Sequence, residues 1–266
     1  MKLGIFDSGL GGLLITKAIR GALPDPDIVY LGDTLHLPYG NRSEEAITDY
    51  TKRAMQHLFD AHDCKLVIIA CNTASAAALR NLQQNWLPKH YPDRNILGVV
   101  VPTLEAAIDA GHKKIGLIAT SYIVDSGVYQ EELSKIDDEI KLLAHSTPLL
   151  VPLIEQSGEA WLEDVLASYL KSFDGDDIEA LILGCTHYPS FTRTAEKLIG
   201  AGVDVMGQDT IIPAKLADYL TRHPEYANAI SQGGATEFLV TDLTDNYKQA
   251  AQRLYGADIK IQKTEY

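Results

Sequence analysis

Cysteine is the residue type in this sequence with the clearest capacity for chemistry. Cys71 follows the apolar run Leu66–Ala70, and Cys185 follows the apolar run Ala180–Gly184. In both places polar side chains come next, so the same pattern occurs once in each half of the chain. A thiolate accepts protons and a thiol donates them, so two such cysteines could carry out acid–base chemistry.

The elements expected before and after each cysteine would put both in a ligand-binding position. Ligands of open α/β sheets bind beyond the carboxyl ends of the strands. We expect Asn72 or Thr73 to cap a helix over residues 74–84, and Pro189 suits the first turn of a helix after Cys185. A thiolate at pH 7 costs about 2 kcal/mol, which a helix N-terminus could offset by about 0.3 to 1 kcal/mol per contact. The alternative is that both cysteines only fill the core.

Two loops and one histidine add further candidates. The first apolar run ends in a glycine-rich turn that carries Asp7 and Ser8, but this turn matches neither a dinucleotide fingerprint nor a P-loop. A second turn contains Asp33 and Tyr39, which could line a site. His187 lies two positions beyond Cys185 and could exchange a proton with a substrate.

Composition excludes several classes of protein. The chain has 266 residues, 46% hydrophobic and 22% charged, which indicates a globular protein. Its formal net charge of -13 argues against nucleic-acid and membrane partners. The absence of a long apolar run, together with three cysteines and no C-x-x-C pair, predicts a cytoplasmic protein with reduced thiols. The eight His and three Cys lack paired ligand spacing, so no metal site is expected.

Short apolar runs alternate with longer amphipathic stretches, which predicts a β-α-β order. Because the expected strands are hydrophobic on both faces, they indicate a parallel sheet covered by helices. We expect strands at 2–6, 28–31, 65–70, 96–101, 114–119 and 180–184, helices at 13–22, 72–84 and 103–110, and a final strand, helix and edge strand at 237–241, 246–255 and 259–262.

Four motifs together resemble the glutamate racemases of the aspartate/glutamate racemase superfamily, in order and in spacing. They are Phe6-Asp7-Ser8-Gly9-Leu10-Gly11-Gly12, Gly32-Asp33-Thr34 with Pro38-Tyr39-Gly40, Ala70-Cys71-Asn72-Thr73-Ala74, and Gly184-Cys185-Thr186-His187-Tyr188-Pro189. The resemblance implies two similar open α/β domains with mainly parallel sheets, facing each other across a central cleft. The first would comprise residues 1–97 plus 209–266, and the second residues 98–208.

The resemblance also implies an activity: cofactor-independent racemisation of L-glutamate and D-glutamate, which supplies D-glutamate for peptidoglycan. One cysteine of the pair Cys71 and Cys185 removes the α-proton as a thiolate, and the other delivers a proton to the opposite face as a thiol. Asp7 and His187 assist them, while Asp33 and Glu155 match acidic positions with supporting roles. No metal or cofactor is implied, the partner is the small molecule glutamate, and relatives often form homodimers. The implied substrate-binding residues are Asp7, Ser8, Pro38, Tyr39, Gly40, Cys71, Asn72, Thr73, Thr120, Cys185, Thr186 and His187.

Other functions stay open at this point. The chain departs from the family pattern at Ile123, where a threonine is usual, and at Gly207-Gln208-Asp209. An aspartate or broad-specificity racemase of the same superfamily is therefore an alternative. A cysteine hydrolase with Cys185 as its nucleophile explains only one cysteine, and a non-catalytic amino-acid-binding module requires neither.

Overall fold

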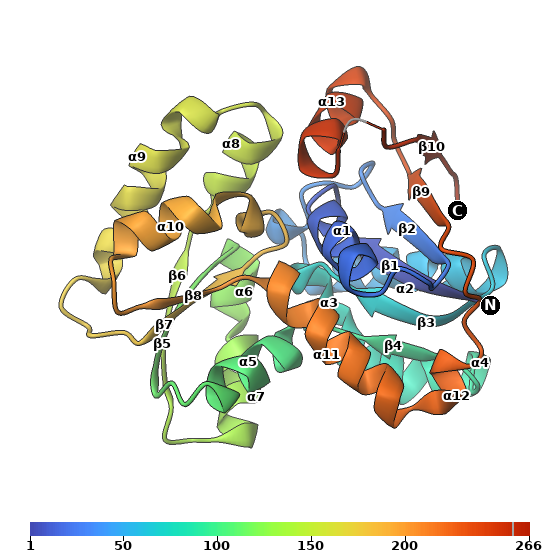
Figure 1. Cartoon of the computed structure of the whole chain (residues 1–266), viewed down its shortest axis with the longest axis horizontal. Coiled ribbons are helices and arrows are strands. Elements are labelled where there is room, and N and C mark those ends of the chain that lie inside the picture. The colour runs from blue at the N-terminus through green and yellow to red at the C-terminus, as the bar shows by residue number, and fades with distance from the viewer. Residues whose placement is uncertain (257) are drawn as a thin grey trace.

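Two parallel β-sheets form the framework of the protein (Figure 1). The computed structural model describes residues 1–256 and 258–266. The six-stranded sheet has the order β10-β9-β2-β1-β3-β4, with β1 (Lys2–Asp7), β2 (Ile28–Gly32), β3 (Cys64–Ile69), β4 (Asn95–Leu97), β9 (Thr236–Val240) and β10 (Ile261–Lys263). The four-stranded sheet has the order β6-β5-β7-β8, with β5 (Lys114–Ala119), β6 (Lys141–Ser146), β7 (Ala180–Gly184) and β8 (Asp204–Met206). The predicted α/β class with parallel sheets is confirmed.

Helices connect successive strands and cover the sheets. They are α1 (Gly12–Ala22), α2 (Glu44–Asp60), α3 (Asn72–Asn81), α4 (Leu87–His90), α5 (Val100–Asp109), α6 (Ser121–Ser126), α7 (Val128–Ile136), α8 (Leu150–Glu155), α9 (Glu159–Leu170), α10 (Thr192–Ile199), α11 (Gln208–Arg222), α12 (Pro224–Ala227) and α13 (Asp245–Leu254). Short turns of helix are η1 (Tyr39–Asn41), η2 (Leu82–Trp86), η3 (Lys171–Phe173) and η4 (Tyr188–Phe191). Within the described residues, no helix combines the length and apolar character that a membrane span requires.

The most buried strands are those that the sequence marked by continuous apolar runs. Every residue of β2 and of β7 is buried, and β1 and β3 each have one partly exposed residue. These strands lie inside their sheets, where helices cover both faces and water reaches neither. The carboxyl ends of β1, β3 and β7 therefore carry the first polar residues after a buried run.

The predicted strand at 96–101 is wrong in its second half. Strand β4 ends at Leu97, and α5 begins at Val100 although three valines follow Gly98. Pro102 fits the first turn of this helix, where its missing N–H has no partner to lose, and Thr103 donates from its backbone N–H to Val99 O at 3.3 Å. The tertiary structure thus overrides the β-propensity of the valines.

The sequence did not predict β6 and β8. Strand β6 lies at one edge of its sheet and is only partly buried, so it lacks a continuous apolar run. Strand β8 has three residues at the other edge, and only Met206 is buried. Edge strands of this kind have weak hydrophobic patterns because one side of the strand has no neighbour.

The chain passes between the two sheets twice. Strands of the six-stranded sheet come from residues 2–97 and 236–263, and strands of the four-stranded sheet come from residues 114–206. Helix α11 follows β8 but packs along α1, as the front of Figure 1 shows. The division into residues 1–97 plus 209–266 and residues 98–208 stays a prediction.

We predict that Gly32→Ala destabilises the fold. A Cβ at Gly32, the last residue of β2, would overlap the carbonyl oxygen of Gly9, which also accepts a hydrogen bond of 2.6 Å from the Tyr30 hydroxyl. The Gly9 carbonyl belongs to the backbone and cannot move aside as a flexible side chain could. The free energy of unfolding of the variant, measured by chemical denaturation, should therefore fall by about 1 to 3 kcal/mol.

The matched control for that variant is Gly21→Ala. Gly21 lies in α1, and a Cβ there meets no atom within 4 Å. Alanine is the better helix former, so the control should gain about 0.5 to 1 kcal/mol or stay neutral. Equal stability of the Gly32 variant and the unmodified protein would contradict the close approach.

Candidate active site

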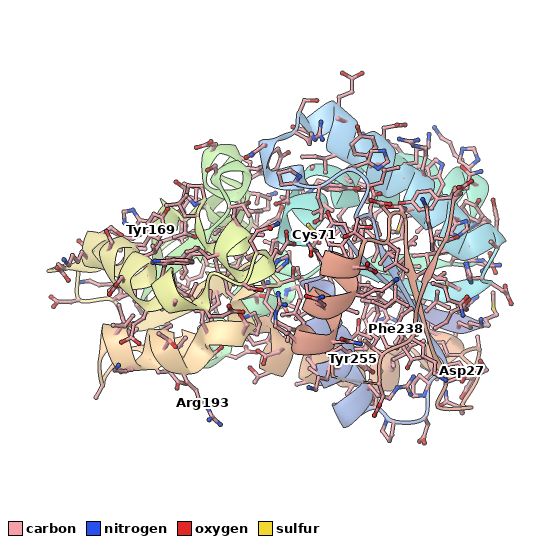
Figure 2. The ribbon with its side chains drawn as sticks, turned by 90° about the horizontal axis from the view of Figure 1, so that it is seen from above. Asp27, Cys71, Tyr169, Arg193, Phe238 and Tyr255 are labelled. Carbon is pink, nitrogen blue, oxygen red and sulfur yellow. The ribbon has the colours of Figure 1, made fainter. Side chains whose placement is uncertain are left out.

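Residues that follow the strands of one sheet contact residues that follow the strands of the other. Cys71 comes two residues after β3, and Cys185 directly follows β7, as the two apolar runs predicted. Both side chains lie in the interior, and each cysteine is 6% exposed. Figure 2 shows Cys71 near the middle of the molecule, between the elements of the two sheets. We call this zone of contact the seam.

Cys71 itself caps helix α3, which corrects the expectation that Asn72 or Thr73 would do so. The Cys71 Sγ accepts a hydrogen bond of 3.4 Å from Ala74 N–H. The Ser8 hydroxyl lies 3.3 Å from the same sulfur. Asn72 and Thr73 are already helical, so their side chains are free to contact other elements.

The surroundings of Cys71 favour its thiol form. Burial raises the pKa of this thiol to about 12, the charge of Asp7 and then of Cys185 adds to the rise, and the hydrogen bonds from Ser8 and Ala74 oppose it. The hydrogen bond from the start of α3 lowers the pKa of Cys71, as expected of a helix N-terminus, but burial raises it more. Desolvation outweighs the helix dipole.

Cys185 has a different partner, the His187 imidazole. His187 Nδ1 lies 3.7 Å from Cys185 Sγ, and Nε2 lies 2.9 Å from Glu155 Oε1 at the end of α8. Burial alone would lower the pKa of His187, but the hydrogen bonds and negative charges of Cys185 and Glu155 raise it well above its usual value. The imidazolium is thus the favoured form beside this sulfur.

The Asp7 carboxylate links the two sides of the seam. Asp7 Oδ1 accepts a hydrogen bond of 3.2 Å from the Thr186 hydroxyl, and Oδ2 accepts one of 3.0 Å from Gly9 N–H. Burial raises the pKa of Asp7, while the nearby charge of His187 and these hydrogen bonds oppose the rise. A Cβ on Gly11 would overlap Thr186 and His187 atoms, so this glycine permits the close approach.

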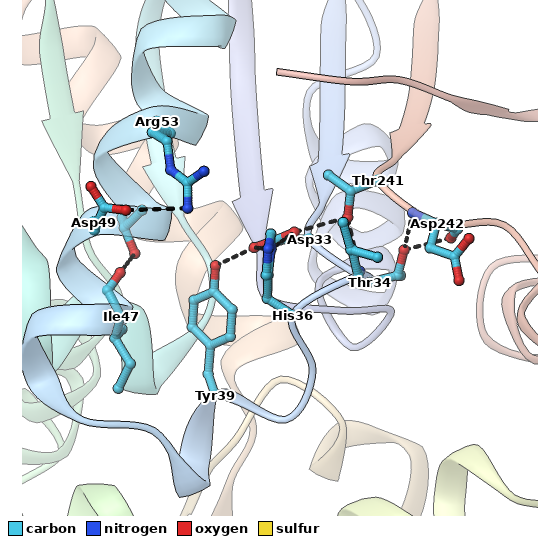
Figure 3. A network of polar contacts seen from close by, with 11 residues as sticks. Asp33, Thr34, His36, Tyr39, Ile47, Asp49, Arg53, Thr241 and Asp242 are labelled. Carbon is cyan, nitrogen blue, oxygen red and sulfur yellow. Dashed lines mark hydrogen bonds and ion pairs between the residues drawn. The ribbon is translucent and has the colours of Figure 1, made fainter.

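The Asp33 carboxylate holds a second loop at the edge of the seam (Figure 3). It accepts hydrogen bonds of 2.6 Å from the Tyr39 hydroxyl and 2.8 Å from the Thr241 hydroxyl, and His36 Nδ1 lies 2.8 Å away. Asp33 is completely buried, so its oxygens are occupied by protein groups. His36 was not named from the sequence, although it lies between the two parts of the second motif, and Thr241, which no motif adjoins, was missed.

A further cross-seam contact involves Thr120, at the end of β5. Its hydroxyl lies 3.1 Å from the Thr73 hydroxyl, and its Cβ would lie 3.3 Å from a Cβ on Gly40. Gly40 follows Tyr39 in η1, and Pro38 directly precedes that turn. The structure therefore brings Thr73, Thr120 and the Pro38–Gly40 loop together.

Asn72 is held by residues that the sequence did not single out as functional. Its side-chain amide forms a pair of hydrogen bonds with Gln208, of 2.7 and 2.9 Å, and its Oδ1 also accepts one of 2.7 Å from the Tyr129 hydroxyl. Gln208 lies in the stretch that departs from the family pattern. A buried glutamine at the first residue of a helix gives no periodic signal.

A cavity of about 700 Å³ lies away from the cysteines, between α3, α5, α7 and α11. Its lining includes Arg80, Val101, Glu132 and Lys215 but neither Cys71 nor Cys185. Among the described residues, no group of three His, Cys, Asp or Glu side chains could hold a metal ion. We therefore place the candidate site at the seam, where the titratable groups converge.

The fold is that of a racemase. The Asp/Glu/Hydantoin racemase family matches residues 14–210. The glutamate racemase of Paracoccus denitrificans is 39% identical over 254 residues, which is 91% of this chain and 92% of that protein. The chain belongs to the glutamate racemase family, so the predicted class, an isomerase, is confirmed.

Solved structures agree with this assignment. A glutamate racemase isoform from Bacillus anthracis superposes with a TM-score of 0.89 at 28% identity, over 99% of this chain and 97% of that chain. The glutamate racemase of Francisella tularensis, in complex with D-glutamate, gives a TM-score of 0.85 at 28% identity, over 99% and 96% of the two chains.

We predict that Glu155→Gln shifts the pH dependence of turnover. The variant loses the carboxylate charge that helps to keep His187 protonated, so the pKa of His187 should fall. Because the imidazolium exists only below that pKa, the alkaline fall of kcat/KM should begin at lower pH. A pH profile from about pH 6 to pH 10 measures it.

The matched control is Glu159→Gln. Glu159 is exposed and lies 3.7 Å from Arg253, not beside His187. In the control, the alkaline fall of kcat/KM should begin at the same pH as in the unmodified protein. An unchanged alkaline fall in the Glu155 variant would show that this carboxylate does not set the pKa of His187.

Proposed function

We propose that this protein interconverts L-glutamate and D-glutamate through Cys71 and Cys185, without a cofactor, and so supplies D-glutamate for peptidoglycan. One observation carries the proposal: two cysteines follow buried strands of two different sheets, and each contacts its own polar partner in the same seam. Removal and delivery of a proton on opposite faces of one carbon require two such groups.

The reaction has two proton transfers. One sulfur, as a thiolate, takes the α-proton: the C–H bond breaks, an S–H bond forms, and the carbon keeps the electron pair. The other sulfur, as a thiol, then gives its proton to the opposite face and becomes a thiolate. The sulfurs exchange their protonation states in each turnover, and the reverse reaction uses them in the opposite roles.

The electrostatics around the two sulfurs fit one acid and one base. Cys71 lies near the Asp7 carboxyl group and holds its proton, since burial raises its pKa to about 12. Cys185 lies 3.7 Å from an imidazole that favours its cationic form. In the proposed reaction Cys71 is therefore the first proton donor, and Cys185 is the sulfur that contacts the imidazole.

The carbanion formed between the transfers places negative charge on the α-carboxylate. Asn72 and Thr73 are the first two residues of α3, and their backbone N–H groups have no carbonyl one turn earlier. These backbone donors are the groups that we assign to the carboxylate, since the Thr186 hydroxyl already donates to Asp7. A preformed set of donors lowers the barrier because it need not reorganise during the reaction.

Glutamate is the favoured substrate over aspartate. The relatives from Paracoccus denitrificans and Aquifex aeolicus, at 39% and 37% identity, are glutamate racemases, and the Francisella tularensis relative was solved with D-glutamate. The aspartate racemase of Picrophilus torridus shares the fold at 18% identity, with a TM-score of 0.61. Ile123, where the family usually has threonine, is 1% exposed and packs in the core.

The decisive measurement is racemisation by the purified protein with a chelator and no added cofactor. Circular dichroism should show loss of optical activity from either enantiomer of glutamate, with deuterium from solvent at the α-carbon. Cys71→Ala and Cys185→Ala should each lower kcat by at least about 100-fold, because each removes one proton carrier.

Cys64→Ala is the matched control, since Cys64 is a completely buried thiol at the start of β3, outside the seam. It should keep the turnover per folded molecule. Faster turnover of aspartate than of glutamate would favour the broad-specificity alternative. Full activity of the Cys71 variant would end the two-cysteine proposal and favour a nucleophile at Cys185 alone.

Substrate entry requires the seam to open, because both cysteines are almost fully buried. A disulfide across the seam should therefore block turnover. Cβ atoms at positions 40 and 120 would lie 3.3 Å apart, a few tenths of an ångström short of the about 3.5 to 4.5 Å of a disulfide. We expect the oxidised Gly40→Cys/Thr120→Cys variant to be at least about tenfold slower than the same variant after reduction.

The reduced double variant is the internal control for the two substitutions. Gly40→Cys and Thr120→Cys alone should show no such response to oxidant, and mass spectrometry verifies the crosslink. Equal turnover of the crosslinked and reduced forms would mean that glutamate reaches the sulfurs without separation of the halves.

A further inference from the structure

Gln208 is a buried polar residue that lies outside the four sequence motifs and forms several side-chain hydrogen bonds. Its side chain is completely buried. Its Oε1 accepts a hydrogen bond of 2.7 Å from Asn72 Nδ2, and its Nε2 donates to Asn72 Oδ1 at 2.9 Å and to the Thr103 hydroxyl at 3.1 Å. The two amides thus form a closed pair, and all of these polar atoms are satisfied without water.

The amide pair joins segments that are far apart in the sequence. Gln208 begins α11, just after the chain leaves β8. Asn72 begins α3 in the half of the six-stranded sheet, whereas Thr103 and Tyr129 lie on α5 and α7, which accompany the other sheet. The Tyr129 hydroxyl donates a hydrogen bond of 2.7 Å to Asn72 Oδ1. Gln208 therefore connects the start of α3 to α5 and α11, which lie in the two segments where the chain passes from one sheet to the other.

The other end of this connection is Cys71. Asn72 directly follows Cys71, and Cys71 is the N-cap of the helix that Asn72 begins. A rotation or shift of Asn72 moves the cap residue, because one peptide bond joins them. Proton transfer depends steeply on the distance between the sulfur and the α-carbon, and misplacement by about 1 Å can cost about 100-fold in rate.

We propose that Gln208 is a positioning residue for Cys71, which fixes the first turn of α3 by its amide pair with Asn72 and so sets the proton-transfer distance of that sulfur. This inference rests on the proposed two-cysteine reaction. It assigns Gln208 no contact with substrate.

The test replaces the Gln208 side chain by an apolar one of similar size. Gln208→Leu cannot form the pair, so kcat/KM should fall by about 10- to 100-fold at a temperature at which the variant is folded. Primary deuterium isotope effects with α-deuterated L- and D-glutamate then separate positioning from loss of structure. They should change in opposite directions, rising for the enantiomer whose α-hydrogen Cys71 removes and falling for the other.

A second variant keeps the test valid should leucine prevent folding. Gln208→Glu retains the acceptor for Asn72 Nδ2, and its protonated form can also donate to Asn72 Oδ1. Burial favours that neutral form. The activity of this variant relative to the unmodified protein should therefore increase as the pH is lowered.

Two controls complete the experiment. Gln130→Leu changes an exposed glutamine next to Tyr129, bonded only to Ser134 on its own helix, and should leave both isotope effects unchanged. Cys71→Ala, in the same assay, tests the underlying reaction. An inactive Cys71 variant together with unchanged isotope effects in Gln208→Leu and a pH-independent relative activity in Gln208→Glu would overturn this inference alone. A fully active Cys71 variant would overturn the proposed reaction and the inference with it.

Discussion

The organisation of the protein depends on polar side chains that are buried where two sheets meet, and that obtain their hydrogen-bond partners from the opposite half. Asp7 is completely buried, and a hydroxyl from the other half, that of Thr186, compensates one of its oxygens. Asn72 similarly depends on Gln208 and Tyr129. A buried polar group without a partner costs about 1 to 3 kcal/mol, so these hydrogen bonds favour the relative arrangement of the two halves that the structure shows. The same arrangement brings both cysteines into one seam.

The two sulfurs have unlike surroundings although the proposed reaction is symmetric. A carboxyl group lies near Cys71 and an imidazole contacts Cys185. Enantiomers have equal free energies in water, so these differences cannot change the equilibrium between them. They do give the two sulfurs different environments, and burial favours the thiol form of Cys71.

Most carboxylates at the seam act on other protein groups. Asp33 accepts hydrogen bonds from Tyr39 and Thr241, and Glu155 contacts the His187 ring. Their lone pairs are occupied in the closed structure, which suits them to orient loops and to stabilise an imidazolium. Glutamate carries two carboxylates, so protein donors that share the negative charge of Asp33 and Glu155 reduce the repulsion between these residues and the substrate.

The sequence by itself determined where the buried strands lie along the chain, the glycine-rich turn and the placement of both cysteines after strands, because continuous apolar runs and local turn chemistry are encoded by neighbouring residues. Only the tertiary structure decided that Cys71 caps its own helix, that Val99–Val101 leave the strand, and that Gln208 holds Asn72. The protonation of Cys71 likewise follows from burial between two halves, which no local pattern records. The amide pair of Asn72 and Gln208 joins residues 136 positions apart, and hydrophobic periodicity carries no information about which distant polar groups will meet.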